Sequence, residues 1–165
     1  MNRKILVLAG LVAVVAVVAG SLVVSARTTT LRAGLTGAKE VSATGEMGVG
    51  DPNGRGSATV RINVRRQRAC FKLAWSRIVP PSMAHIHEGG ADVAGPIVIP
   101  LFMTGDEAAQ GTDQDLPDTL KSVGGCVSGV EKALLRAIRR SPRDYYVNIH
   151  NDDFPAGAIR GQLHR

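Results

Sequence analysis

YYVNIHNDDFPAGAIRGQL, residues 145–163, is the stretch of sequence that decides the fold. Its first six residues alternate between two faces, as the side chains of a β-strand do. Residues 151–157 combine Asn, Asp, Pro and Gly, the residue types that favour a turn. Residues 158–163 predict a last strand, so the stretch is expected to form an antiparallel hairpin. The two faces of the first strand carry Tyr145, Val147 and Ile149 on one side, and Tyr146, Asn148 and His150 on the other.

Several other segments repeat this strand pattern. Residues 56–64 and 69–78 alternate between apolar and polar side chains and predict a second hairpin, with Trp75 in the core. About seven short strands with turns between them predict an all-β fold, an antiparallel Greek-key-like β-sandwich. The remaining strands are expected at residues 31–36, continued by 37–41, around residues 84–90, and at 97–102, where Pro100 breaks the strand.

One segment has a helical period instead. Within residues 130–140, apolar side chains recur at helical spacing while charged side chains take the opposite face. Ser128 is the expected N-cap, and Pro142 lies just beyond the end. The sequence therefore predicts one short amphipathic helix at about residues 130–140.

The first 26 residues have the pattern of an export signal. Arg3 and Lys4 precede an almost unbroken apolar run, residues 5–24, and small residues up to Ala26 suit a signal peptidase. The alternative is an uncleaved membrane anchor, because an apolar run of roughly 20 residues can span a bilayer. Both interpretations place the domain, residues 31–165, outside the cytoplasm, either secreted or tethered at the cell surface through residues 5–24.

The two cysteines, Cys70 and Cys126, are expected to form a disulfide, which is the default in an oxidising compartment. Closing a loop of roughly 55 residues would stabilise the fold by about 4 kcal/mol in the chain-entropy description. A reactive thiolate or a metal-binding thiolate is the less favoured alternative, because the two residues are far apart in an exported chain.

The chain is basic, with 20 Lys and Arg against 14 Asp and Glu. Arginine clusters can attract nucleic acid, anionic lipid or an acidic cell-wall polymer, although exposed strand edges and helix faces commonly carry charge. Nucleic acid is not an expected partner, since an exported protein seldom meets it and few aromatic side chains are present to stack on bases. The clusters are Arg61, Arg65, Arg66 and Arg68, and Arg136, Arg139, Arg140 and Arg143.

Two of the four histidines, His85 and His87, are separated by one residue in a strand-like segment. They share a face and lie on the order of 7 Å apart. His150 joins them if its strand lies alongside with the same face turned towards them. Three imidazoles suit zinc or copper, and Glu88, Asp152 or water would fill a fourth position or hold a ring nitrogen.

A purely structural role for these histidines is the alternative. Neutral imidazole both donates and accepts hydrogen bonds, so the three rings can bond one another, Asn148 and backbone carbonyls, and thereby orient two loops. Arg160 is likewise expected either to pair with Asp152 or Asp153, or to bind an anion beside the histidines. No Gly-x-Ser-x-Gly elbow presents a nucleophile, so the sequence predicts no enzymatic activity.

Three blocks of sequence resemble the CHRD family, which is named after the repeated domain of chordin. They are LTGAKEV at residues 35–41, AHIH at 84–87 with GPIV at 95–98, and YVNIH at 146–150 with FPAGAIRGQL at 154–163. The resemblance extends over about residues 31–163 and is closest to single-domain, bacterial-type members with a signal peptide. It implies an extracellular or membrane-associated β-sandwich. Ser42-Ala43-Thr44 replaces the family's usual proline-rich continuation.

A looser similarity is to the copper/zinc superoxide dismutases, in which a His-x-His strand precedes an acidic, glycine-rich loop. The chain lacks the second histidine-bearing zinc loop of those enzymes, so dismutase activity is not expected. The sequence thus supports two functions. The first is a non-catalytic extracellular or cell-surface module that binds a protein, a cell-wall polymer or a small ligand through its loops. The alternative is a zinc-binding or copper-binding protein that uses His85, His87 and His150.

Overall fold

The computed structural model describes residues 28–104, 117 and 119–165. Eight strands of this part form one antiparallel sheet, with a single α-helix and two short 3-10 turns, so the all-β class is confirmed. The strands are β1 (Thr29–Thr36), β2 (Arg55–Asn63), β3 (Arg68–Ser76), β4 (Met83–Glu88), β5 (Ile97–Met103), β6 (Ser122–Ser128), β7 (Tyr145–His150) and β8 (Ile159–Gln162). The helix is α1 (Lys132–Arg140), and the 3-10 turns are η1 (Gly37–Lys39) and η2 (Pro142–Asp144).

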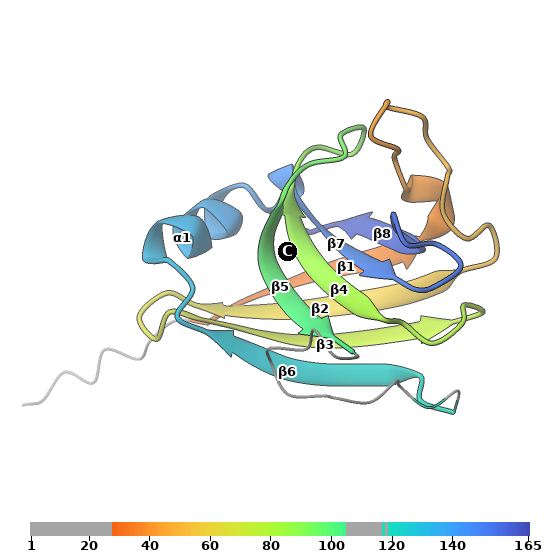
Figure 1. The fold of residues 1–165 in the computed structure, drawn as a ribbon. Coiled ribbons are helices and arrows are strands. Elements are labelled where there is room, and N and C mark those ends of the chain that lie inside the picture. The colour runs from red at the N-terminus through yellow and green to blue at the C-terminus, as the bar shows by residue number, and fades with distance from the viewer. Residues whose placement is uncertain (1–27, 105–116, 118) are drawn as a thin grey trace, which may run out of the picture.

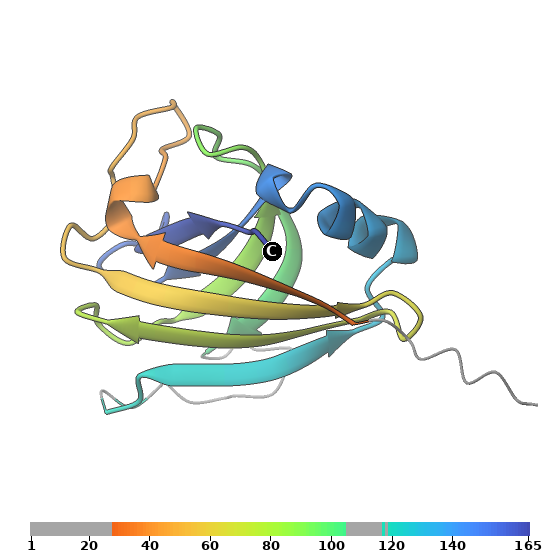
Figure 2. The same ribbon diagram turned by 180° about the vertical axis from the view of Figure 1, so that it is seen from behind.

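The sheet curls over on itself and encloses the core. Its strand order is β5-β4-β7-β8-β1-β2-β3-β6, and Figure 1 shows β4 and β5 lying across β1, β2 and β3. The chain crosses between the two halves after β3, after β5 and after β6, as in a Greek-key-like sandwich. In Figure 2, α1 lies at one end of the curved sheet, away from the loop that follows β1. The largest fully buried apolar side chains are Leu31, Leu35, Ile62, Leu73, Ile86, Ile99, Leu135, Ile138, Ile149, Ile159 and Leu163.

The hairpin of residues 145–163 lies in the middle of one half of the sheet. β7 pairs with β8 on one side and with β4 on the other. Val147 and Ile149 point into the core, as their alternation predicts, and Trp75 is buried there too. The other face of β7 is also covered, because all six of its residues are buried. The polar side chains on that face therefore need partners inside the protein.

The expected continuation of the first strand through residues 37–41 is wrong. The chain turns instead through η1, because Gly37 lies directly against the backbone of Asp51 and has no Cβ to prevent that approach. This turn directs the Glu40 side chain into the protein, where only 2% of the residue is exposed.

The expected break at Pro100 is also wrong, since β5 is a single strand. It is an edge strand that pairs only with β4, so the missing N–H of Pro100 costs no ladder hydrogen bond. The register of the β4–β5 pair shifts twice, between Ala84 and His85 and between Ile86 and His87. Such bulges re-aim side chains, and here they adjoin both histidines.

Strand β6 has no counterpart among the expected strands. Its sequence, SVGGCVS, is rich in glycine and mostly exposed, so it has no alternating burial pattern. It pairs with β3 at the other edge of the sheet, and the ring of Phe71 lies over Gly125, where a side chain would crowd it.

The predicted helix is present as α1 but begins at Lys132. Ser128 closes β6 instead of capping the helix, and the N-cap position is held by Glu131 without a side-chain cap. Leu135 and Ile138 are its buried residues, which fits an amphipathic helix.

The export signal expected at residues 1–26 lies outside the described residues. Within the described part of the chain, no helix has the length and apolar character needed to cross a bilayer.

A disulfide joins Cys70 to Cys126, as expected. The two residues are directly opposite each other in the β3–β6 pair, 56 positions apart in sequence. The bond thus attaches the glycine-rich edge strand to the sheet.

We expect the double substitution Cys70→Ser and Cys126→Ser to lower the free energy of unfolding by about 4 kcal/mol, because the unfolded chain regains the entropy of an open loop. Urea unfolding followed by circular dichroism measures the change. The reduced wild-type protein is the control and should match the double variant. An unchanged midpoint in the variant would contradict a stabilising role for the bond.

Candidate functional site

The face of β4, β7 and β8 that points away from the core carries a group of polar side chains, which we call the polar cluster. Strand register brings these residues together: His85 lies opposite Asn148, and Asn148 lies opposite Arg160. Glu40 reaches in from the segment after η1, where its Oε2 accepts a hydrogen bond from Asn148 Nδ2 at 3.3 Å. The polar cluster consists of Glu40, His85, His87, Tyr146, Asn148, His150, Arg160 and Gln162.

The structure brings the three histidines together. One ring nitrogen from each of His85, His87 and His150 lies within 4.8 Å of the others. Their ring centroids are 5.1 to 6.1 Å apart, and all three residues are buried. The geometry that the metal hypothesis requires, with His150 turned towards the His-x-His pair, is therefore present.

Backbone carbonyls determine which nitrogen carries the proton in two of the rings. His87 Nδ1 lies 2.9 Å from the Gly95 carbonyl, and His150 Nδ1 lies 3.0 Å from the Pro155 carbonyl. A carbonyl only accepts, so each Nδ1 donates and each neutral ring has its lone pair on Nε2. His150 Nε2 accepts from His85 Nδ1 at 3.3 Å. His87 Nε2 is buried and has no hydrogen-bond partner among the described residues.

Burial keeps these imidazoles neutral. The pKa of His85 is lowered from 6.5 to about 4, chiefly by loss of hydration and also by the neighbouring His150 and His87. Burial is also the main cause that lowers the pKa of His87 and of His150. At neutral pH the cluster therefore presents uncharged imidazoles, the form that binds metals.

Glu40 and Asn148 form a carboxyl–amide pair, and one oxygen atom of each side chain takes no part in the hydrogen bond between them. Glu40 Oε1 and Asn148 Oδ1 are both buried without a partner among the described residues. A proton on the carboxyl group would turn one of these acceptors into a donor. Burial raises the pKa of Glu40 to about 8, although the charge of Arg160 and the bond from Asn148 oppose the rise. Glu40 is thus expected to be protonated at neutral pH, as an acid paired with an amide.

Arg160 is only 1% exposed, and its guanidinium lies 3.5 Å above the centre of the Tyr146 ring. Its Nη2 donates to the Gly90 carbonyl at 2.6 Å and to Gln162 Oε1 at 3.4 Å. These contacts replace the expected pairing with Asp152 or Asp153, both of which are exposed. Tyr146 also stacks on His87, with ring centroids 4.8 Å apart, so it links the arginine to the histidines.

The two acidic candidates for a fourth position lie outside this group. Glu88 is exposed and bonds the hydroxyl of Tyr145, because the alternation of β4 turns it away from His85 and His87. Asp152 is exposed in the turn between β7 and β8. Among the described residues, neither forms a hydrogen bond with the three histidines.

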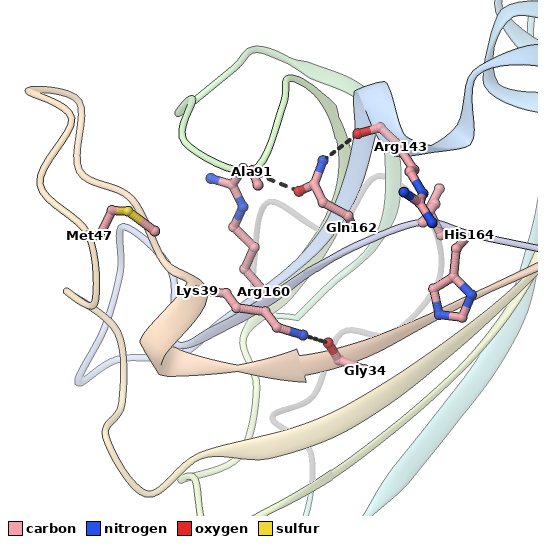
Figure 3. Close-up of a pocket in the computed structure, with 9 residues that line it drawn as sticks. Gly34, Lys39, Met47, Ala91, Arg143, Arg160, Gln162 and His164 are labelled. Carbon is pink, nitrogen blue, oxygen red and sulfur yellow. Dashed lines mark hydrogen bonds between the residues drawn. The ribbon is translucent and has the colours of Figure 1, made fainter.

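A pocket of about 500 Å³ opens beside the polar cluster (Figure 3), and we call it the Arg160 pocket. Lys39 and Arg160 line it from two sides, and Lys39 Nζ donates to the Gly34 carbonyl at 2.6 Å. Gln162 Nε2 is fixed by the carbonyls of Gly89 and Arg143. The residues that line the pocket are Gly34, Lys39, Met47, Ala91, Arg143, Arg160, Gln162, Leu163 and His164.

Several residues of the polar cluster and of the Arg160 pocket were not predicted from the sequence. Tyr146 shares a strand face with Asn148 and His150, so the alternation of β7 already contained that signal. Glu40 lies inside one of the blocks that resemble the CHRD family, but nothing local indicates that it is buried. Lys39 and Arg143 line the pocket because distant segments of the chain fold next to each other, and no local sequence pattern reveals this.

The curled antiparallel sheet, its cross-strand disulfide and its loop-covered polar face define an all-β domain of extracellular type. The model of the CHRD domain family matches residues 31–163, and the chain therefore belongs to the CHRD domain family. This confirms the family that the three sequence blocks indicated. No curated protein and no solved structure matches the chain. At family level, membership supports a non-catalytic module of extracellular type.

Replacing Glu40 tests the state of the carboxyl–amide pair. Because the pKa of Glu40 is raised in the folded protein, the wild type loses stability as pH rises from about 4.5 to about 8, by at most about 1.4 kcal/mol per pH unit. Glu40→Gln keeps the shape of the neutral acid and cannot ionise. We expect it to match the wild type near pH 5 and to be the more stable protein at pH 8, as measured by urea unfolding.

Glu46→Gln is the matched control for this experiment, because Glu46 is an exposed glutamate in the same loop. Its stability should follow the wild type at every pH. The three proteins differ at one glutamate each, so the difference between the curves isolates Glu40. Parallel curves for Glu40→Gln and the wild type would show that Glu40 is not protonated in the folded state.

Proposed function

We propose that this protein is an exported, non-catalytic binding module, and that the Arg160 pocket is the site that binds an anionic ligand. The observation that carries the proposal is the composition of the pocket wall. Lys39, Arg143 and Arg160 supply donors, while none of the described residues that line the pocket has a carboxylate. Cationic donors in a concave site suit a carboxylate or phosphate group.

The uncharged part of the pocket lining favours a ligand with an apolar body. Met47, Leu163 and Gly34, which has no side chain, line the pocket together with the charged residues. A volume of about 500 Å³ falls in the range of small-molecule sites. A small aromatic or aliphatic carboxylate has this combination of charge and apolar surface, and so does an anionic end group of a cell-wall polymer or protein.

The fixed contacts of the pocket support recognition over catalysis. The Gly90 carbonyl holds Arg160, and the Gly89 and Arg143 carbonyls hold Gln162, so this part of the pocket wall is already fixed before a ligand arrives. Orientation in advance lowers the entropy cost of binding. An arginine stays protonated at every physiological pH, so it offers no base for proton transfer.

Benzoate is a suitable probe, because it joins a carboxylate to an apolar ring. We expect benzoate to bind the purified protein in low-salt isothermal titration and benzamide, its neutral counterpart, to bind at least about tenfold more weakly. Arg143→Gln removes one cation from the rim but keeps the backbone carbonyl that holds Gln162. It should weaken benzoate binding about tenfold, the effect of one charge-assisted hydrogen bond.

Arg66→Gln is the matched control, since Arg66 is an exposed arginine in the turn between β2 and β3 and does not line the Arg160 pocket. It changes the net charge equally and should leave benzoate binding unchanged. Equal binding of benzoate and benzamide, or equal losses in Arg143→Gln and Arg66→Gln, would overturn the anion site.

Export is supported by the basic start and apolar run of residues 1–26 and by the Cys70–Cys126 disulfide. We expect cleavage after Ala26, so that Edman sequencing of protein recovered from outside the cytoplasm of its host begins at Arg27. Recovery from the membrane fraction with Met1 at the N-terminus would instead establish the tether formed by residues 5–24.

A further inference from the structure

The lone pair of His87 Nε2 has no hydrogen-bond partner among the described residues, although this atom is buried. A buried acceptor without a partner lowers the stability of a fold, so its retention calls for a physical reason. The ring cannot turn over to relieve the cost without losing the bond from Nδ1 to the Gly95 carbonyl. The lone pair is therefore held in place beside two other imidazoles.

The hydrogen-bonding alternative accounts for only part of this arrangement. His87 and His150 do hold two loops through the carbonyls of Gly95 and Pro155. His85 and His150 also bond each other. These bonds use both Nδ1 donors and the lone pair of His150, but they leave the lone pair of His87 unused. A structural role therefore accounts for the contacts of His85 and His150 but leaves the buried lone pair of His87 unexplained.

The spacing of the nitrogen atoms fits a single bound cation. Two imidazole nitrogens at 2.0 to 2.1 Å from a tetrahedral zinc ion are about 3.3 Å apart. His85 Nδ1 and His150 Nε2 are separated by 3.3 Å, and one nitrogen of His87 lies within 4.8 Å of the other two ligand atoms. Coordination of one ion by all three therefore requires the ligand nitrogens to draw closer together.

The outer contacts of the rings match those of metal-binding histidines. Such a ring generally donates its second N–H to a carbonyl or carboxylate, which fixes the tautomer and aims the free nitrogen at the metal. His87 and His150 both donate Nδ1–H to a backbone carbonyl. His85 needs only to move its proton from Nδ1 to Nε2, a change of tautomer that leaves the ring neutral.

We propose that His87 Nε2, His150 Nε2 and His85 Nδ1 together bind one zinc or copper(II) ion, with water or a small ligand in the remaining position. Nitrogen donors select these ions over calcium and magnesium, which prefer oxygen. The site is distinct from the Arg160 pocket, because none of the three histidines lines that pocket. Tyr146 separates the site from the cation of Arg160.

Isothermal titration of the purified, disulfide-bonded protein with zinc chloride and with copper(II) sulfate, after removal of metal by a chelator, tests the proposal. We expect one ion per chain, tighter binding of copper than of zinc, and no heat with calcium chloride. His87→Gln should weaken binding roughly 100-fold or more. His164→Gln is the matched control for metal binding only, because His164 is an exposed histidine that lines the Arg160 pocket and lies outside the polar cluster.

Imidazole ¹⁵N resonances of the wild-type protein give a second measurement that does not depend on a variant that folds. Zinc should shift Nε2 of His87 and of His150 and leave both nitrogens of His164 in place. The absence of heat with both metals would overturn the proposal. So would unchanged binding in a folded His87→Gln protein, or a loss of binding in His164→Gln.

Discussion

The central position of β7 is the constraint on which the rest of the structure depends. A strand buried on both faces needs apolar packing on one face and hydrogen-bonding partners for most of the polar groups on the other. Val147 and Ile149 meet the first requirement in the core. On the opposite face, Asn148 and His150 are reached by Glu40 and by the Pro155 carbonyl, both from connecting segments. These segments are consequently part of the fold, since without them the polar face of the sheet would be left without partners.

The alternation of apolar and polar side chains along the strands made much of this sheet predictable from the sequence. The hairpin of residues 145–163, the shared face of His85 and His87 and the core position of Trp75 all follow from the period of two in a strand. The disulfide followed from the oxidising compartment and a count of two cysteines. Each of these features depends on a local pattern or on composition, which a single sequence contains.

The remaining features depend on contacts between distant segments. SVGGCVS has no alternation, and it forms β6 because β3 offers a free edge and Phe71 covers Gly125. The burial of Glu40 requires the turn that Gly37 makes against Asp51, which the run of residues 35–41 does not reveal. Arg160 meets Gly90 across 70 positions of sequence, although the nearby Asp152 and Asp153 are its more obvious partners. Register and loop closure decide such pairs, and neither is encoded locally.

The loop between β4 and β5 contacts both sites at once. Its Gly95 carbonyl holds His87, its Gly90 carbonyl holds Arg160, and its Ala91 forms part of the pocket wall. A ligand that immobilises this loop at the histidines changes the conformational freedom of the loop at the Arg160 pocket, and the reverse also holds. Thermodynamic linkage makes that influence reciprocal, so the coupling free energy is the same in both directions. If both proposed sites bind their ligands, this loop is the physical connection through which one affects the other.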